Sequence, residues 1–396
     1  MRVAYVCTDP GVPVLGRKGA SVHAQAVLRV LVDRGAQVHL VAARLGGPLP
    51  AGLQGLRVHL LPAVTAGSAA ERELAARGTD AAVAGVLDTL GGVDLVYERY
   101  SLWGRTATAW SREAGVPSVL EVNAPLVQEQ AEHRVLVDRA GAEDVAGAAL
   151  SAATVVTCVS ESVAAWARAR TCSPDRVHVV PNGVDPDRVR PAARPVTSAT
   201  ASPFTLGFVG TLKPWHGVDT LIDALALLSG QSPGAYRLLL VGDGPEADAL
   251  RHRADAAGVT ALVEQTGAVE PAAVPQLLQR MDLGVAPYPH LADFYFSPLK
   301  IYEYLAAGLP VVASAVGDVP SLLRGGALGL LVEPGRADVL AAAIAQLRDD
   351  PVRRAGLRTA GRAAVLRDHT WGGVVDRVLS LLAAACPAGL PAAVAV

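Results

Sequence analysis

Residues 296–310 read FSPLKIYEYLAAGLP, a stretch that predicts a short helix followed directly by a strand. Ser297 suits an N-cap, because its hydroxyl can accept a hydrogen bond from the first helical turn, and Pro298 suits the first helical position. Gly308 and the proline two residues later cannot continue a helix. The apolar run at 310–313 then predicts a strand, and a helix leading directly into a strand is typical of α/β folds.

The start of this helix is a predicted phosphate site. The backbone N–H groups of Leu299 and Lys300 have no partner within the helix and point outwards, which favours an anion. Glu303 lies one turn further on the same face, where its carboxylate can accept hydrogen bonds from a ribose diol. The stretch therefore predicts a nucleotide site, with a capped core helix that carries an exposed glutamate as the alternative.

Outward from this helix, the whole chain alternates short apolar runs with amphipathic helical stretches. This alternation predicts an α/β fold with parallel sheets. It is interrupted once, at residues 181–203, where prolines recur among Thr, Ser and Ala, as is typical of a linker. The expected strands are 2–7, 37–42, 57–61, 95–98, 118–122, 154–159 and 177–180 before the interruption, and 204–209, 237–241, 262–265, 283–286 and 310–313 after it.

Two α/β halves joined by one linker predict two Rossmann-like domains facing a cleft, with ligands at the carboxyl ends of the strands. We expect the first domain at residues 1–190, the linker at 191–203 and the second domain at 204–368. The tail, 386–396, has Pro and Gly among small residues, so we expect it to be loose.

The composition limits the class of protein. Of the 396 residues 51% are hydrophobic and 18% charged, and the net charge of -2 gives no reason to expect nucleic acid as a partner. Four cysteines without Cys-x-x-Cys spacing suit a reducing cytoplasm. No run suits a signal peptide or a transmembrane span, so we expect a cytoplasmic protein and leave peripheral contact with the inner face of a membrane open. The oligomeric state is not indicated.

Three loops of the first half follow predicted strands, where parallel sheets bind their ligands. The first loop has two glycines, Gly16 and Gly19, which allow a ligand to approach the backbone closely. The third loop carries Asn123, whose amide can form hydrogen bonds but cannot act as a base. The candidate substrate contacts in these loops are Lys18 and either Glu98 or Arg99.

In the second half, residues 210–217 read GTLKPWHG and follow the first strand. Lys213 is the permanent cation of this loop, which lies at the end of a predicted strand. A surface turn with a lone lysine is the alternative. Lysine is scarce in this chain, since Lys18 and Lys300 are the only others.

Residues 295–312 resemble the signature helix of the family 4 glycosyltransferases, which have the GT-B architecture. That family has a glutamate, seven residues, and a second glutamate that opens Glu-Ala-Met-Ala-Ala-Gly-x-Pro-Val-Val. Here Tyr295 stands at the first acid position, and Glu303 opens Glu-Tyr-Leu-Ala-Ala-Gly-Leu-Pro-Val-Val. The resemblance implies that Glu303 holds the ribose, and that Tyr295 or Asp293, two residues upstream, meets the donor sugar.

The resemblance extends over nearly the whole chain. The family's loop at 210–217 usually carries an arginine and a lysine that grip the diphosphate, and here Thr211 and His216 take their positions. The resemblance therefore implies that Lys213, the permanent cation of the loop, holds the diphosphate with His216 assisting. The family's Val-Gly-Asp-Gly-Pro turn is present around Gly242, and Val269 lies in the segment that the family places beside the base.

Such a resemblance implies a retaining, metal-independent glycosyltransferase that needs no cofactor. It would move a sugar from a UDP- or GDP-linked donor to a hydroxyl of a small-molecule or lipid-linked acceptor, in bacterial secondary-metabolite or cell-envelope biosynthesis. Asn123 would lie beside the donor sugar, where many members have a histidine. A last helix at 369–385 would cross back and pack on the first domain.

Two alternatives share this architecture. The departures at Tyr295, Thr211 and Asn123 are compatible with a catalytically silent nucleotide-sugar-binding protein. A nucleotide-sugar epimerase of the same fold is the other alternative.

Two further motifs mimic other kinds of site. Gly242-x-Gly-x-x-Ala247, with Glu264 downstream, matches a dinucleotide fingerprint, but it follows the second strand of its domain and not the first. Asp185-Pro186-Asp187 is an acidic triplet of a kind that holds metal elsewhere, but it lies in the proline-rich linker. We therefore expect neither a dehydrogenase nor a metal site.

Overall fold

The computed structural model describes residues 1–64, 67–192, 203–291, 294–295 and 297–386. Most of the predicted linker, Asp293 and all but the first residue of the predicted tail lie outside these ranges. The chain divides into two compact units. Unit 1 contains Met1–Asn182, Tyr295–Ser297 and the chain from Trp371 on, and unit 2 contains Gly183–Phe294 and Pro298–Thr370. The chain thus changes unit within the Asn-Gly turn.

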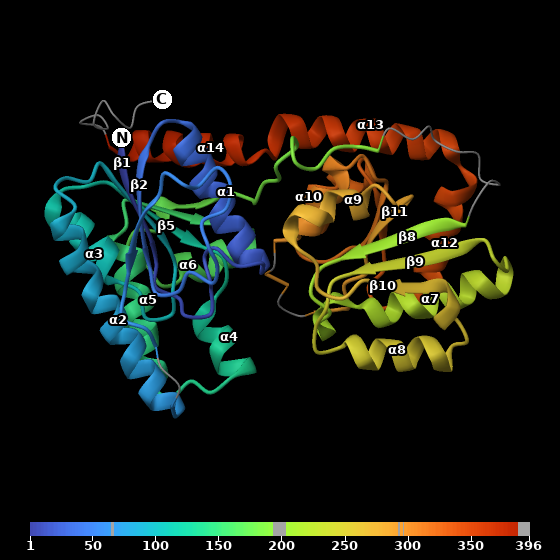
Figure 1. Cartoon of the computed structure of the whole chain (residues 1–396), viewed down its shortest axis with the longest axis horizontal. Coiled ribbons are helices and arrows are strands. Elements are labelled where there is room, and N and C mark those ends of the chain that lie inside the picture. Colours follow the sequence, from blue (N-terminus) through green and yellow to red (C-terminus); the bar gives the residue numbers. More distant parts are fainter. Residues whose placement is uncertain (65–66, 193–202, 292–293, 296, 387–396) are drawn as a thin grey trace. The chain divides into compact units, whose positions relative to one another are not determined.

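Unit 1 is a sheet of seven parallel strands in the order β3-β2-β1-β4-β5-β6-β7, covered by helices on both faces (Figure 1). Helices α2, α3 and α5 pack side by side, and α1 packs against α14. The elements are β1 (Arg2–Cys7), α1 (Gly19–Asp33), β2 (Gln37–Ala42), β3 (Arg57–Leu60), α2 (Ala69–Thr89), β4 (Leu95–Arg99), α3 (Thr106–Ala114), β5 (Ser118–Val122), α4 (Leu126–His133), α5 (Arg139–Ala152), β6 (Val155–Cys158), α6 (Glu161–Arg168), β7 (Val177–Val179) and α14 (Trp371–Ala385).

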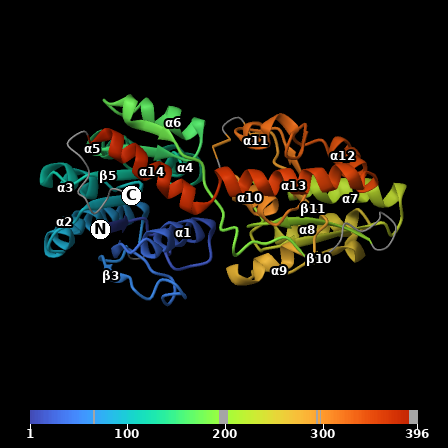
Figure 2. The same cartoon turned by 90° about the horizontal axis from the view of Figure 1, so that it is seen from above.

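Unit 2 is a sheet of six parallel strands in the order β10-β9-β8-β11-β12-β13. Helix α7 packs between α8 and α12, and α10 packs against α13, as the view in Figure 2 also shows. The elements are β8 (Phe204–Val209), α7 (Val218–Gln231), β9 (Tyr236–Val241), α8 (Ala247–Ala256), β10 (Val263–Gln265), α9 (Val274–Leu278), β11 (Leu283–Ala286), α10 (Leu299–Ala306), β12 (Val311–Ser314), α11 (Val319–Leu322), β13 (Leu330–Val332), α12 (Ala337–Asp349) and α13 (Pro351–Asp368).

Both sheets have the strand order of a doubly wound fold. In each unit the chain winds outward from the first strand, returns to its other side and continues in the opposite direction. The order reverses between β1 and β4 in unit 1 and between β8 and β11 in unit 2. Ligands of such sheets bind at the carboxyl ends of the strands near this reversal. The predicted fold class, two parallel-sheet α/β units, is confirmed.

The predicted strands are all present, with ends within one residue of those expected. The strand missed is β13, which has three residues and too short an apolar run to stand out from the loops around it. Ser160 caps α6, because its hydroxyl accepts a hydrogen bond from the Val163 N–H at 3.3 Å.

Helix α14 belongs to unit 1, although it follows the whole of unit 2 in the sequence. Its first residue, Trp371, is buried and tilts against the His23 ring of α1 with 4.7 Å between ring centroids. The apolar face of the helix is buried along its length. This face gives the last helix a large contact with the unit in which the chain began.

Candidate active site

The carboxyl ends of β8 and β9 meet at two glycines in unit 2. A methyl group at position 242 would lie 2.1 Å from the carbonyl oxygen of Gly210, and Gly242 has φ +136, so glycine is required there. The Leu212 N–H donates to the carbonyl of Asp243 at 2.9 Å, which ties the 210–217 loop to the Gly242 turn. The predicted phosphate loop and the predicted glycine turn are therefore neighbours at one edge of the sheet.

Within the 210–217 loop, Lys213 and His216 differ in their surroundings. Lys213 is half-buried, and its Nζ lies 5.3 Å from the centre of the Trp215 ring. The Nδ1 of His216 forms a hydrogen bond with the Thr211 carbonyl, so this nitrogen carries the hydrogen. Burial, the Lys300 ammonium and Lys213 lower the pKa of His216 to about 3. His216 is therefore neutral here, and its assistance to Lys213 stays a prediction.

A second cation, the side chain of Lys300, lies against the same loop. Its Nζ is 4.7 Å from the centres of both the Phe208 and the Tyr288 rings and 3.4 Å from the Tyr288 hydroxyl. A methyl group at position 210 would lie 3.7 Å from this Nζ. Burial lowers the pKa of Lys300 to about 7 and outweighs the opposing effect of Glu303. The sequence prediction used only the backbone N–H of this residue.

Lys300 is held in place by the helix on which it lies. One turn later on α10, the Tyr304 hydroxyl accepts a hydrogen bond from the Val209 N–H at 2.9 Å, and it lies 3.4 Å from the carbonyl of Val285. Tyr304 thus bridges β8 and β11 at the point where the strand order reverses. The sequence carried a signal for this, because Lys300 precedes Ile301, Tyr304 and Leu305 on one buried face of α10 at helical spacing.

Glu303 is joined to the loop after β10 through an arginine. Arg188 donates to the Pro271 carbonyl at 3.0 Å and lies 3.5 Å from Glu303 Oε1. Burial raises the pKa of Glu303, while Arg188 and Lys300 act in the opposite direction. Val269, half-buried two residues before Pro271, is therefore part of the same neighbourhood as Glu303. Arg188 was not singled out in the sequence.

The expected cap of α10 is wrong. The N-cap position is Pro298, which has no side chain that can cap, and α10 begins at Leu299. The Ser297 hydroxyl is buried and has no hydrogen-bond partner among the described residues. Pro298 has φ -81 and ψ 70, so the chain enters the helix one residue later than predicted and carries Ser297 away from the capping position. The N–H groups of Leu299 and Lys300 still open the helix.

In unit 1, a buried carboxylate gathers residues from three elements. Glu121 on β5 accepts a hydrogen bond from the Tyr97 hydroxyl at 2.6 Å and one from Asn123 Nδ2 at 2.6 Å. Arg99 Nη1 lies 3.2 Å and His23 Nε2 3.0 Å from its Oε1. Although burial acts to raise it, the pKa of Glu121 is lowered to about 2 by His23, Arg99 and Tyr97. Sequence reasoning missed this group, because its members are spread over a hundred residues.

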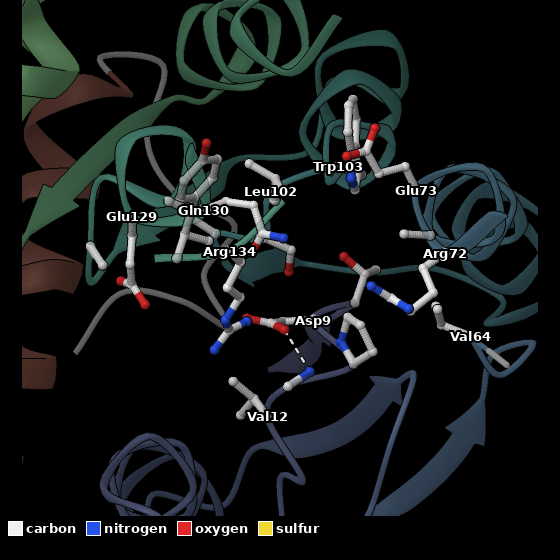
Figure 3. A pocket seen from close by; sticks show the side chains of 18 of the residues that line it. Asp9, Val12, Val64, Arg72, Glu73, Leu102, Trp103, Glu129, Gln130 and Arg134 are labelled. Carbon is white, nitrogen blue, oxygen red and sulfur yellow. Dashed lines mark hydrogen bonds between the residues drawn. The ribbon is translucent and has the colours of Figure 1, made fainter. Parts of the chain in front are cut away.

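A cavity of about 540 Å³ lies beside this network, within unit 1. Arg99 and Asn123 both line it, and the Asn123 amide is oriented by its bond to Glu121. In Figure 3, Arg72 and Arg134 reach toward the cavity from opposite sides. The remaining polar lining includes the carboxylates of Asp9, Glu73 and Glu129, and the aromatic lining is Tyr100 and Trp103. A cavity with these groups can hold a small polar molecule.

Arg99 and Glu98 point to opposite faces of β4, as successive residues of a strand must. Glu98 does not line the cavity and is fully buried, and burial together with Asp80 raises its pKa well above the usual range. Of the two predicted substrate contacts, Arg99 is therefore the one that lines the cavity. Lys18 is exposed, and its Nζ donates a hydrogen bond to the Gly11 carbonyl at 3.1 Å.

The remaining predicted residues are two glycines at or before the start of α1 and the pair Tyr295 and Asp293. Gly16 is packed tightly, since a methyl group there would lie 2.8 Å from Pro13, whereas Gly19 is exposed at the first turn of α1. Tyr295 is buried in unit 1, where its hydroxyl donates to Glu129 Oε2 at 3.2 Å. Asp293 lies outside the described residues.

In the two motifs that mimic other kinds of site, the acidic residues Asp185 and Glu264 take part in local contacts. Asp185 caps a turn by accepting the N–H groups of Asp187 and Arg188, both at 3.0 Å. Glu264 is exposed on β10 and paired with Arg280. Within the described ranges, no group of three or more His, Cys, Asp or Glu side chains is arranged to hold a metal ion. The same ranges also contain no helix that is long and apolar enough to cross a membrane.

Comparison with known proteins defines the class. The model for glycosyl transferases group 1 matches residues 203–350, and the model for Glycosyltransferase Family 4 matches residues 17–188. The D-inositol 3-phosphate glycosyltransferase 1 of Catenulispora acidiphila is 30% identical over 331 residues, which cover 77% of this chain and 76% of that protein. The D-inositol 3-phosphate glycosyltransferase of Stackebrandtia nassauensis is 28% identical over 393 residues, or 91% of this chain and 85% of that protein.

Solved structures agree in fold at lower identity. Sucrose-phosphate synthase from Thermosynechococcus elongatus has a TM-score of 0.75 and 20% identity, covering 98% of this chain and all of that one. Anabaena HepE in complex with UDP and glucose has a TM-score of 0.72 and 21% identity, covering 97% and 100%. The two units are those of a GT-B glycosyltransferase. The chain belongs to the group 1 glycosyltransferases, family 4.

Proposed function

We propose that the chain is a retaining glycosyltransferase that moves a sugar from a UDP- or GDP-linked donor to a hydroxyl of a small-molecule acceptor. The observation that carries this proposal is the arrangement at the carboxyl edge of the unit 2 sheet. There the loops at Gly210 and Gly242 pack together, and Glu303 is joined through Arg188 to the loop after β10. The UDP in the similar Anabaena structure supports a nucleoside diphosphate as the ligand.

In the proposed complex, Glu303 holds the ribose and Val269 lies beside the base. The turn at Gly242, the N–H groups of Leu299 and Lys300 and the side chain of Lys213 hold the diphosphate, because they offer hydrogen-bond donors and charge to an anion. His216, as a neutral imidazole, assists by holding the loop in place through its hydrogen bond with the Thr211 carbonyl.

The reaction transfers charge to the leaving group. The bond between the sugar C1 and the β-phosphate oxygen breaks, and its electron pair stays on that oxygen. The acceptor oxygen bonds to C1 on the same face, and its proton passes to a phosphate oxygen. Groups that stabilise the growing negative charge lower the barrier most, and in this proposal they are protein groups, so neither a metal nor a cofactor takes part.

The acceptor is proposed to bind the unit 1 cavity, with Arg99, Asn123 and Lys18 as contacts. Because the relatives named above are D-inositol 3-phosphate glycosyltransferases, that compound is the first acceptor to test. Lipid-linked acceptors are the next to test. They would bring the protein, which we propose to be cytoplasmic, into contact with the inner face of the membrane. The role of Tyr295 at the donor sugar rests on the family resemblance alone.

Nucleoside-diphosphate binding to a Glu303→Ala variant tests the donor site. We expect its affinity to fall by about 2 kcal/mol or more, the loss of charge-assisted hydrogen bonds to the ribose. The matched control is Glu264→Ala, which removes an exposed carboxylate of the same unit and should leave the affinity unchanged. The opposite pattern would instead support dinucleotide binding at the Gly242 turn.

Donor consumption, measured with excess EDTA to remove free metal ions, then separates the functional alternatives. A transferase consumes donor faster with acceptor than without it, an epimerase converts donor without acceptor, and a silent binding protein does neither.

A further inference from the structure

The two loop positions that carry the family's cations are uncharged in this chain. Thr211 stands at one of them, and at the other His216 is kept neutral by burial and by the Lys300 ammonium. The loop itself therefore offers a diphosphate one permanent charge, that of Lys213. A second positive charge beside the diphosphate would stabilise it further as it leaves.

Lys300 supplies a charge at the place where the loop lacks it. Its ammonium lies between the Phe208 and Tyr288 rings, and the His216 ring packs against both, with centroids 5.9 Å and 6.2 Å away. On the remaining side is Gly210, which is half-buried and has no side chain to cover the ammonium.

The surroundings of Lys300 are those of a group kept ready for an anion. Aromatic rings stabilise a cation only partly, and a buried ammonium normally has a carboxylate partner. Among the described residues, no carboxylate lies within ion-pair distance of Lys300, although Glu303 one turn away acts on it electrostatically. Burying the ammonium costs free energy, and a negatively charged ligand that binds beside it offsets this cost.

We propose that the Lys300 side chain binds the diphosphate of the donor and stabilises it as it leaves, in place of the cations missing at 211 and 216. This inference rests on the proposed donor site and adds the side chain that supplies its second positive charge. The second positive charge at the diphosphate site therefore comes from the first turn of α10 and not from the loop after β8. The two rings hold the ammonium beside Gly210, on the side that faces this loop.

The proposal predicts a pH dependence that no permanent cation would produce. With a pKa of about 7 in the free protein, Lys300 loses its proton above neutral pH unless a bound anion holds it. The titratable groups around it are Glu303, Lys213, the imidazole of His216, whose pKa is lowered to about 3, and the Tyr288 hydroxyl, whose pKa is raised by burial. A nucleoside diphosphate is already fully ionised there, since its last phosphate pKa is about 6.

The experiment is to measure UDP and GDP affinity by calorimetry from pH 7 to 9 for wild type, Lys300→Met and Lys213→Met. Wild type should lose affinity by up to about tenfold per pH unit above pH 7.5. Lys300→Met should bind on the order of 10- to 100-fold more weakly at pH 7, with no such slope. It should melt no lower than wild type without ligand, because an apolar side chain of similar length replaces a buried ammonium. Lys213→Met is the matched control, which weakens binding but keeps the slope.

Wild-type affinity that does not change with pH overturns the inference, as does a Lys300→Met variant that binds like wild type. Should Lys300→Met fail to fold, the wild-type slope and its persistence in Lys213→Met still decide. Absence of any UDP or GDP binding by wild type overturns the proposed function and this inference with it, whereas pH-independent binding overturns this inference alone.

Discussion

The buried carboxylate of Glu121 should be one of the main sources of stability in unit 1, and Glu121→Gln tests this. The carboxylate accepts hydrogen bonds from Tyr97 and Asn123 and lies within 3.2 Å of Arg99 and 3.0 Å of His23. Its pKa is lowered from 4.5 to about 2, which corresponds to about 3 kcal/mol of stability at neutral pH. The glutamine also leaves the buried Arg99 without a counter-charge, so we expect a total loss of about 3–5 kcal/mol.

Chemical denaturation between pH 7 and pH 3 measures this loss. Because the folded-state pKa is depressed, the carboxylate contributes fully above pH 4.5, and its contribution falls as the pH drops from there toward 2. The gap between wild type and Glu121→Gln should therefore narrow in acid. Glu113→Gln, an exposed carboxylate on α3, is the control and should change stability by less than about 0.5 kcal/mol. A gap below about 1 kcal/mol at pH 7, or one that stays constant down to pH 3, would refute the assignment.

Two further variants test how the units are built. Gly242→Ala should destabilise the protein by about 4 kcal/mol or more in denaturant titrations, because the new methyl would meet the Gly210 carbonyl at a backbone φ of +136. Gly258→Ala, at φ +69 with open space around it, should cost only about 1–2 kcal/mol, and equal losses for the two would contradict the close approach. Trp371→Ala should lower the free energy of unfolding by about 3–5 kcal/mol, because the ring is buried. Val352→Ala, at an exposed position, is the control and should leave it almost unchanged. A wild-type melting temperature for Trp371→Ala would show that α14 does not depend on this residue.

The locations of the strands and of the nucleotide motifs could be predicted from the sequence because both depend on neighbouring residues. A run such as 204–209 is apolar on both faces, and the pattern alone marks a strand buried inside a parallel sheet. The helix that carries Glu303 is likewise defined by residues within two turns, down to Gly308, which ends it at φ +65. The position of its cap was the exception, since Ser297 satisfies the local rule for a cap but the backbone path places Pro298 at that position.

The groupings of charge were decided by the tertiary structure. Glu121 meets Tyr97, Arg99 and His23 because β5 lies beside β4 and α1 crosses the same face, and the strand order that brings them together is not encoded in any local pattern. Lys300 looks like an ordinary helix residue in the sequence, yet Tyr304 fixes α10 so that the ammonium lies between Phe208 and Tyr288, residues eighty positions apart in the chain. The sequence by itself determined the elements and the family, because these follow from short-range periodicity and contiguous motifs. Which side chains share a buried environment, and therefore which pKa values are shifted, depends on long-range packing and was settled only in three dimensions.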